Sequence, residues 1–320
     1  MTSSVILLSP IHRPLGWPAE RLRGISAAKI TAGLPGSLGL LIFWGALLAI
    51  APAAWGKDFE TVSFPAPHLS GIEVPLNVIL PNGYHGSARR YPVVYLLHGY
   101  TAHYSDWVVR SSITQYARHY QEIIVMPEAG TSWYVNNYAN PKLKWRDYFI
   151  YDVIPYVDHH FRTVAARNGR ALAGTSMGGY GALLLGLKYP NLFAAAASLS
   201  GVVTSADPSF EQFVTDDIAK RIIEDDFGPF GGPGRDENDL SRLAKQIPAS
   251  QAPQLYLSIG TSDKYLGTNR NFVRLLSSLK IPYRYNELRG GHEWVVWDPE
   301  LKRVLAFLAP LIGTLPAGRP

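Results

Sequence analysis

One serine of this 320-residue chain stands in a setting suited to nucleophilic chemistry. Ser176 lies in Gly174-Thr-Ser-Met-Gly178, a G-x-S-x-G segment between a short apolar run and a helix-compatible run. In a strand–turn–helix setting, such a serine stands on a tight turn that presents its Oγ above the sheet. The following helix directs the positive end of its dipole at the site, where negative charge develops. The motif predicts a serine nucleophile, and an ordinary glycine-rich turn is the alternative.

A serine hydroxyl is a weak nucleophile, so the chain must also supply a base and an orienting acid. Of the nine histidines, His292 stands apart because it follows the last predicted strand and precedes the final helix. Asp263 follows another predicted strand, and the chain order Ser176, Asp263, His292 is that of α/β hydrolases. A turn-capping aspartate is the alternative for Asp263. The weaker rivals for the acid are Asp207, Asp239 and Glu287.

Ester chemistry also needs N–H groups directed at the oxyanion of the tetrahedral intermediate. The N–H of Met177, directly after the nucleophile, is one expected donor. The second is expected from Tyr100, in a loop that opens at His98-Gly99 after the apolar run Val93–Leu97. His98 sits at the strand end, where a structural hydrogen-bonding role is favoured over that of a base.

The elements that must position these residues alternate along the chain after residue 56, which is typical of a mostly parallel sheet with helices on both faces. The predicted strands are Ile72–Leu80, Val93–Leu97, Ile123–Met126, Ala171–Ala173, Ala194–Leu199, Leu255–Ile259 and Tyr283–Leu288. The predicted helices are Asp106–Tyr120, Trp145–Phe161, Gly179–Lys188, Asn269–Leu279 and Pro299–Leu311. Residues 202–252, richer in charge, Gly and Pro, predict an insertion over the C-terminal edge of the sheet, with one or two short helices.

The first 53 residues read as a leader and residues 54–320 as one catalytic domain. Leu38–Ile50 carries no charge, and Ala51-Pro-Ala-Ala54 follows it, so the segment predicts a signal peptide cleaved after Ala53 and export of the protein. An uncleaved membrane anchor over residues 38–54 is the alternative. Export would make the protein periplasmic or secreted, and the membrane would be a partner only through an uncleaved anchor.

Composition excludes several classes of protein. The chain has no cysteine, which rules out disulfides, iron–sulfur clusters and a cysteine nucleophile. Hydrophobic residues make up 47% of the chain, enough for a sizeable core. The net charge of +5 comes without a basic run, so nucleic acid is not an expected partner.

Together these segments resemble the esterase family that contains esterase D, the feruloyl and tributyrin esterases and the mycolyltransferases. The resemblance covers roughly residues 60–312 and rests on these matching segments: Leu97-His-Gly-Tyr100, Asp106-Trp107, Met126-Pro127, Ser132-Trp-Tyr134, Asp152–Val157, Phe161-Arg162, Ala173–Ala182, Tyr189-Pro190, Phe193, Ser200-Gly201, Gly260–Asp263, Gly291-His292 and Trp294. It implies an α/β-hydrolase fold and a serine esterase mechanism without metal or other cofactor. It also supports Ser176, Asp263 and His292 as the triad, and Tyr100 with Met177 as the oxyanion hole.

The substrate expected from these observations is a small or carbohydrate-linked ester with a short-chain, acetyl or feruloyl-type acyl group. Trp133, Tyr134 and Trp294 are candidate substrate contacts, and core packing of large aromatic side chains is the equal alternative. An acyltransferase of the mycolyl type shares the acyl-enzyme and stays open. An S-formylglutathione hydrolase is disfavoured, because the chain lacks the cysteine usual after the oxyanion-loop glycine. A silent binding protein and a serine peptidase are further alternatives, and the oligomeric state is not predicted.

Overall fold

The computed structural model describes residues 58–314. All of them belong to one compact unit, Trp55–Pro320. The predicted leader, its apolar run and its cleavage site lie outside the described residues, so they stay predictions. Within residues 58–314, no helix is both long enough and apolar enough to cross a bilayer.

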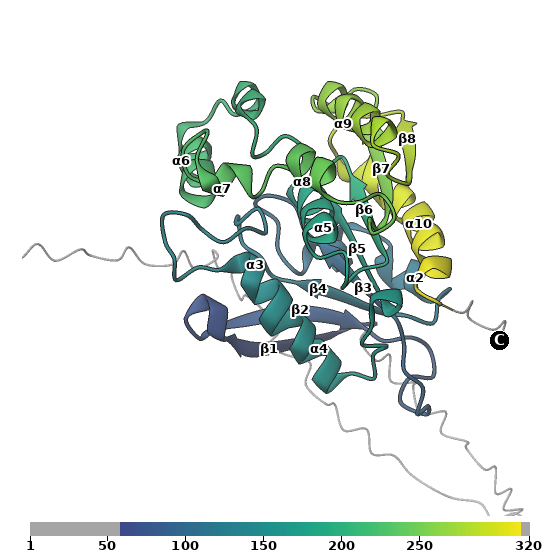
Figure 1. Cartoon of the computed structure of the whole chain (residues 1–320). Helices are drawn as coiled ribbons and strands as arrows, with labels where there is room; N and C mark the ends of the chain where they lie inside the picture. Colours follow the sequence, from purple (N-terminus) through teal and green to yellow (C-terminus); the bar gives the residue numbers. More distant parts are fainter. Residues whose placement is uncertain (1–57, 315–320) are drawn as a thin grey trace, which may run out of the picture. The chain divides into compact units, whose positions relative to one another are not determined.

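The described residues are built on an eight-stranded sheet (Figure 1). Its strands are β1 (Glu60–Ala66), β2 (Ile72–Ile79), β3 (Val93–Leu97), β4 (Ile123–Pro127), β5 (Arg170–Thr175), β6 (Ala195–Leu199), β7 (Gln254–Gly260) and β8 (Tyr283–Leu288). They lie in the order β1-β2-β4-β3-β5-β6-β7-β8. β2 is antiparallel to β1 and to β4, and every other neighbouring pair is parallel. The predicted fold class, a mostly parallel α/β sheet, is therefore confirmed.

Strand order places a switch point between β3 and β5. From β3 the chain proceeds to β4 on one side, and β5 lies on the other side of β3. Loops leaving the C-terminal ends of β3 and β5 therefore diverge, which opens a crevice at this edge of the sheet. Ser176 and Tyr100 follow these two strands, so the topology brings both to the crevice.

Alternate residues of the central strands are buried on opposite faces of the sheet. In β3, Val93, Tyr95 and Leu97 pack into one apolar cluster, and Val94 and Leu96 pack into a second. Both faces are covered, which explains why these strands appear in the sequence as continuous apolar runs.

Helices supply the cover for both faces. They are α1 (Asp106–Arg110), α2 (Ile113–Ala117), α3 (Trp145–Tyr148), α4 (Ile154–His160), α5 (Met177–Lys188), α6 (Asp217–Phe227), α7 (Pro233–Asp236), α8 (Leu240–Gln246), α9 (Leu266–Ser278) and α10 (Trp294–Leu311). Side chains of α3, α4, α5, α8 and α9 join the first cluster, and those of α1, α2 and α10 join the second. Figure 1 shows α3, α4 and α5 in front of the strands.

Every predicted strand occurs, but β1 was missed. Most of β1 is exposed, only Phe64 and Ala66 are buried, and Pro65 interrupts its pattern. An edge strand of this kind has little apolar signal. The predicted helix Asp106–Tyr120 divides into α1 and α2, because Ser111 between them is extended.

Two further helix predictions needed correction. The final helix begins at Trp294 rather than at Pro299, which lies inside it. Its first turn is held by edge-to-face contacts of the Trp294 ring with Trp107 and Trp297, at ring-centre distances of 5.0 and 5.5 Å. The insertion, residues 202–252, holds α6, α7 and α8, which is more helix than predicted. Aspartate caps that accept backbone N–H groups stabilise α6 and α8, through Asp216 and Asp239.

A buried carboxyl group lies just before β4. Glu122 is 1% exposed, and its Oε2 accepts a hydrogen bond of 2.8 Å from Thr314 Oγ1. Among the described residues, its Oε1 has no hydrogen-bond partner. Burial raises the pKa of Glu122 from 4.5 to about 7, and the Thr314 hydroxyl opposes this only in part.

We expect Glu122→Gln to stabilise the protein at pH 8 and to have little effect at pH 4. The unfolded chain loses this proton near pH 4.5 and the folded chain near pH 7, so stability falls as pH rises between these values and stays low above them. The difference is on the order of 3 kcal/mol of unfolding free energy. Thermal unfolding at both pH values measures it, with the exposed Glu73→Gln as control. Equal shifts at both pH values would contradict this account of Glu122.

Candidate active site

Ser176 stands between the end of β5 and the start of α5. Its backbone has φ 54° and ψ −116°, a region that costs a non-glycine residue about 1–3 kcal/mol. The neighbouring strand holds the turn, because Ser176 N–H donates to the Leu199 carbonyl at 2.9 Å. The sharp strand-to-helix turn predicted from the motif is therefore present.

Both glycines of the motif are required by close approach of the backbone. A Cβ on Gly178 would lie 2.3 Å from the Leu97 carbonyl oxygen, and one on Gly174 would lie 2.3 Å from the Gly178 carbonyl oxygen. Such distances exclude any side chain unless the backbone moves. The start of α5 can thus pack directly against the end of β3.

A continuous chain of hydrogen bonds joins the three residues predicted from the sequence. His292 Nε2 lies 2.8 Å from Ser176 Oγ, and His292 Nδ1 lies 2.8 Å from Asp263 Oδ2. A carboxylate only accepts, so Nδ1 carries the proton and Nε2 is left to accept from the serine hydroxyl. Asp263 Oδ1 in turn accepts from the Tyr265 N–H at 2.9 Å.

The surroundings of Asp263 favour its ionised form. Its side chain is fully buried, whereas that of His292 is 24% exposed. Burial by itself would raise the pKa of Asp263, but hydrogen bonds from His292 and the Tyr265 N–H outweigh it and hold the pKa below 3.8. Tyr265 and Trp297 contact the His292 ring edge-to-face, with ring centres 5.2 and 5.0 Å away. The imidazole therefore has little room to rotate.

The rival acids lie elsewhere. Asp207 accepts from the Ser209 N–H in a turn, and Asp239 caps α8. Glu287 forms an ion pair with Arg270 on the exposed side of β8. The structure brings Asp263, and none of these three, to His292.

The loop after β3 lies against the nucleophile. A Cβ on Gly99 would lie 3.4 Å from Ser176 Cβ. Tyr100 follows Gly99, and Met177 N–H opens α5; neither N–H donates to another group among the described residues. Both donors are thus available beside Ser176, as an oxyanion hole requires.

His98 has the structural role predicted for it. It is fully buried, with Nδ1 2.9 Å from the Gly99 carbonyl oxygen and Nε2 2.9 Å from the Ala129 nitrogen. Beneath it, Glu128 accepts N–H groups of Gly130 and Tyr104 at 2.8 and 3.3 Å. Burial by itself would raise the pKa of Glu128. The interactions with His98 and these N–H groups have the larger effect and lower the pKa from 4.5 to about 2. This polar network fixes the loop that carries Tyr100.

Two cavities open on Ser176. The larger, of about 510 Å³, is also lined by His292, Arg110, Trp294 and Trp297. The smaller, of about 160 Å³, is apolar and lies under the insertion; its walls include Trp133, Phe210, Val214, Ile223 and Tyr265. Of the predicted substrate contacts, Trp294 and Trp133 therefore each line one of the two cavities.

Tyr134, the third predicted contact, lies in the core instead. It is 1% exposed, and its hydroxyl donates to the His98 carbonyl at 3.0 Å. Its ring occupies the space where Gly181 of α5 lacks a side chain. This prediction is corrected: the Tyr134 hydroxyl instead holds the backbone of His98, in the loop that carries Tyr100.

Sequence reasoning missed several cavity residues. Tyr265 could have been found, because it follows Asp263 by two positions. Arg110 and Trp297 lie on helices whose ends were misplaced. Phe210, Val214 and Ile223 lie in the insertion, where the sequence gives no sign of which apolar side chains face Ser176.

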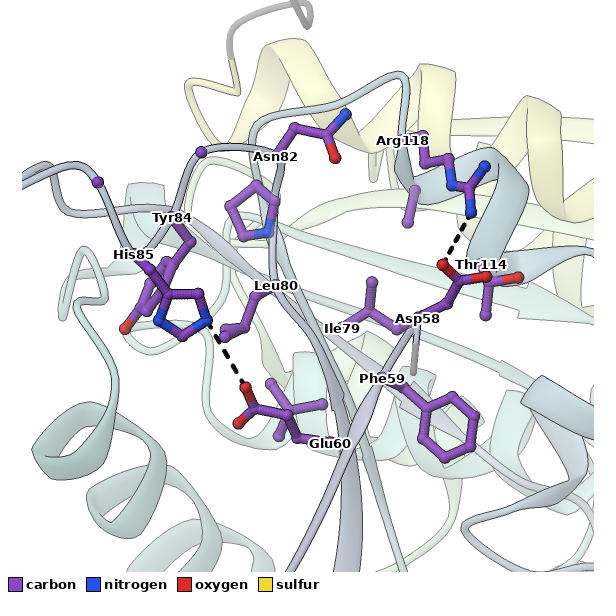
Figure 2. A pocket seen from close by; sticks show the side chains of 15 residues that line it. Asp58, Phe59, Glu60, Ile79, Leu80, Asn82, Tyr84, His85, Thr114 and Arg118 are labelled. Atoms are coloured by element: carbon purple, nitrogen blue, oxygen red, sulfur yellow. Dashed lines mark hydrogen bonds and ion pairs between the residues drawn. The ribbon is translucent and has the colours of Figure 1, made fainter. Parts of the chain in front are cut away.

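Another cavity, of about 350 Å³, lies at the opposite edge of the sheet (Figure 2). It is bounded by the start of β1, the end of β2 and α2. Its polar groups are exposed pairs, Asp58 with Arg118 at 2.7 Å and Glu60 with His85 at 3.9 Å. Neither pair offers a nucleophile held by a base and an acid, so the candidate active site is the crevice at Ser176.

We expect Gly178→Ala to lower both stability and any activity that uses Ser176. The new methyl group would collide with the Leu97 carbonyl and push apart the two segments that carry the predicted oxyanion donors, Tyr100 and Met177. Overpacking of this kind costs about 1–3 kcal/mol of unfolding free energy. Thermal unfolding and ester turnover measure the effect. Gly267→Ala, where a Cβ meets nothing within 4 Å, is the matched control, and equal behaviour of the two variants would contradict the prediction.

Comparisons with known proteins identify the family of this chain. The model of the Esterase family matches residues 68–308. An esterase of Mycobacterium tuberculosis is 30% identical over 276 aligned residues, which cover 79% of this chain. The chain spans 58% of the length of that relative. The diacylglycerol acyltransferase/mycolyltransferase Ag85B of Mycobacterium avium is 26% identical, over 94% of this chain and 96% of its own.

Among solved structures, the fluorophosphonate-binding serine hydrolase F of Staphylococcus aureus superimposes with a TM-score of 0.70 and 26% identity. The match covers 78% of this chain and 97% of that protein. The α/β-hydrolase fold and the family resemblance predicted from the sequence are thus confirmed. This chain belongs to the Esterase family.

Proposed function

We propose that the protein is a serine carboxylic ester hydrolase that acts through an acyl-enzyme on Ser176. The observation that carries the proposal is the pair of 2.8 Å hydrogen bonds from Ser176 through His292 to Asp263. A hydroxyl, a base and a buried carboxylate in this arrangement form the apparatus that makes a serine nucleophilic.

The reaction follows from the roles of these side chains. His292 takes the proton of Ser176 Oγ as the oxygen attacks the ester carbonyl, and Asp263 stabilises the imidazolium that forms. The N–H groups of Tyr100 and Met177 receive the oxyanion of the tetrahedral intermediate. His292 then protonates the leaving alcohol, and water attacks the acyl-enzyme with His292 again as base.

The two cavities support a proposal for where the two halves of the ester bind. The leaving alcohol must lie where His292 can protonate it, and His292 lines the larger cavity. The acyl group then occupies the smaller cavity. Its 160 Å³ lies below the 300–1,000 Å³ of drug-sized ligand sites, which favours a short acyl chain. The larger cavity combines two tryptophan rings with Arg110 and Glu293, a lining suited to a larger, polar alcohol such as a sugar.

An acyltransferase is the second candidate, because the mycolyltransferase relative aligns with nearly the whole chain. It would use the same acyl-enzyme and replace water by an acceptor alcohol in the larger cavity. Export by the N-terminal leader is a further part of the proposal and rests on the sequence of residues 1–53. Incubation with sugar acceptors and mass detection of a new ester separates transfer from hydrolysis.

We expect Ser176→Ala to abolish hydrolysis of p-nitrophenyl acetate by the purified protein. Loss of the nucleophile removes acyl-enzyme formation, so kcat should fall by roughly 10⁴-fold or more. A fluorophosphonate probe should label the unmodified protein at Ser176 and leave the variant unlabelled, as read by mass spectrometry. Ser277→Ala, at an exposed position of α9, is the control. Full turnover by Ser176→Ala would refute the proposal.

We expect Asp263→Asn to reduce kcat by roughly 10³–10⁴-fold while the fold is retained. The amide can donate to Nδ1 and so favours the tautomer in which Nε2 cannot accept the serine proton. Glu287→Gln, which removes the rival acid of β8 and its exposed ion pair, should keep kcat. Steady-state kinetics of both variants decide which carboxylate is the acid. A large loss of kcat in Glu287→Gln, with kcat retained in Asp263→Asn, would give the acid role to Glu287.

A further inference from the structure

A second cavity, with both apolar and charged lining residues, lies in the insertion next to the acyl cavity. Its volume is about 370 Å³, more than twice that of the acyl cavity. Phe210, Val214 and Ile223 line both cavities, so these three side chains form the wall between them. Beyond this wall, the cavity is lined by Pro229 and Phe230.

Helix α6 presents this wall to the active site. Asp216 caps the helix by accepting the Ala219 N–H at 2.8 Å, which fixes its first turn. Ala219 and Ile223 are four residues apart, hence on one face, and both line the acyl cavity. Lys220 and Glu224, one position further along, line only the deeper cavity. Ile223 is 6% exposed and is the α6 residue common to both cavities.

Phe210, a second member of the wall, is held in place. The Phe210 ring meets Trp133 edge-to-face at a ring-centre distance of 5.3 Å and is 3% exposed. At the far end of the deeper cavity, the Arg235 guanidinium lies 4.0 Å from the centre of the Phe230 ring and donates to the Gly228 carbonyl. In the deeper cavity, carbon surface for a ligand that comes from Ser176 is supplied by the wall together with Pro229 and Phe230, and the charged lining residues are Lys220, Glu224 and Arg235.

We propose that Phe210, Val214 and Ile223 limit the length of the acyl chain, and that the deeper cavity is the site that a longer alkyl tail enters once this wall is shortened. The proposal rests on the proposed esterase function. With the wall intact, acetyl and butyryl groups fit, and an octanoyl tail meets Ile223. Truncation of Ile223 joins the two cavities, so the tail of a straight-chain acyl group of about eight carbons gains apolar surroundings. Each methylene buried in this way is worth roughly fourfold in kcat/KM.

The test compares kcat/KM for p-nitrophenyl acetate, butyrate and octanoate. In Ile223→Ala, the ratio of octanoate to acetate should rise at least tenfold over that of the unmodified protein. Ile218→Ala removes the same side chain from an exposed position of the same helix, 71% exposed, and should leave the ratio unchanged. Thermal unfolding of each variant establishes that it is folded.

A second variant, expected to favour shorter acyl chains, keeps the proposal testable if Ile223→Ala does not fold. Ala219 lines the acyl cavity but not the deeper one, so Ala219→Leu shortens the acyl cavity and should lower the ratio of butyrate to acetate several-fold. Two results would refute the proposed wall. One is an octanoate-to-acetate ratio of kcat/KM that Ile223→Ala leaves unchanged, and the other is an unmodified protein that already prefers octanoate. In both cases turnover of acetate and probe labelling of Ser176 would leave the esterase function standing. Loss of those two signals in the unmodified protein would instead refute the esterase function and the wall with it.

Discussion

The hydrogen bond between Ser176 and His292 depends on a close backbone approach between β3 and α5. Gly178 lets the first turn of α5 press against the Leu97 carbonyl, and Ser176 takes a strained backbone conformation to make the turn. Strain of about 1–3 kcal/mol persists only where the surroundings hold it. Here the Leu199 carbonyl accepts the serine N–H, and the sheet on both sides of β5 cannot move apart.

Around this turn, polar side chains hold the loop that carries Tyr100 and the imidazole of His292 in position. Glu128 and His98 hydrogen-bond to the loops around Tyr100. Asp263 accepts hydrogen bonds from the His292 imidazole and from the Tyr265 N–H. Asp263 is buried and Glu128 is half-buried, and each carboxylate is satisfied by several donors, which keeps it ionised and its neighbours oriented. In a chain without cysteine, hydrogen bonds of this kind must fix the loops at the crevice.

Specificity and reactivity reside in different parts of the molecule. Ser176, His292 and the candidate oxyanion donors Tyr100 and Met177 follow strands of the sheet, where the fold itself sets their positions. The walls of the two cavities also include side chains from α1, the start of α10 and the insertion. Changes in these walls can alter the acyl or alcohol group while the turn at Ser176 is left intact, which is how one fold serves many substrates.

From the sequence alone, the α/β order of elements, the turn at Ser176 and the pairing of Asp263 with His292 could be predicted. Each depends on a local signal, namely an apolar run, a glycine spacing or a residue directly after a strand. The place of Tyr134 in the core, the split of α1 from α2 and the two-sided wall at Ile223 could not. They depend on which side chains meet across segments far apart in the chain, and only tertiary packing decides that, because an aromatic or aliphatic residue suits a core and a cavity wall equally well.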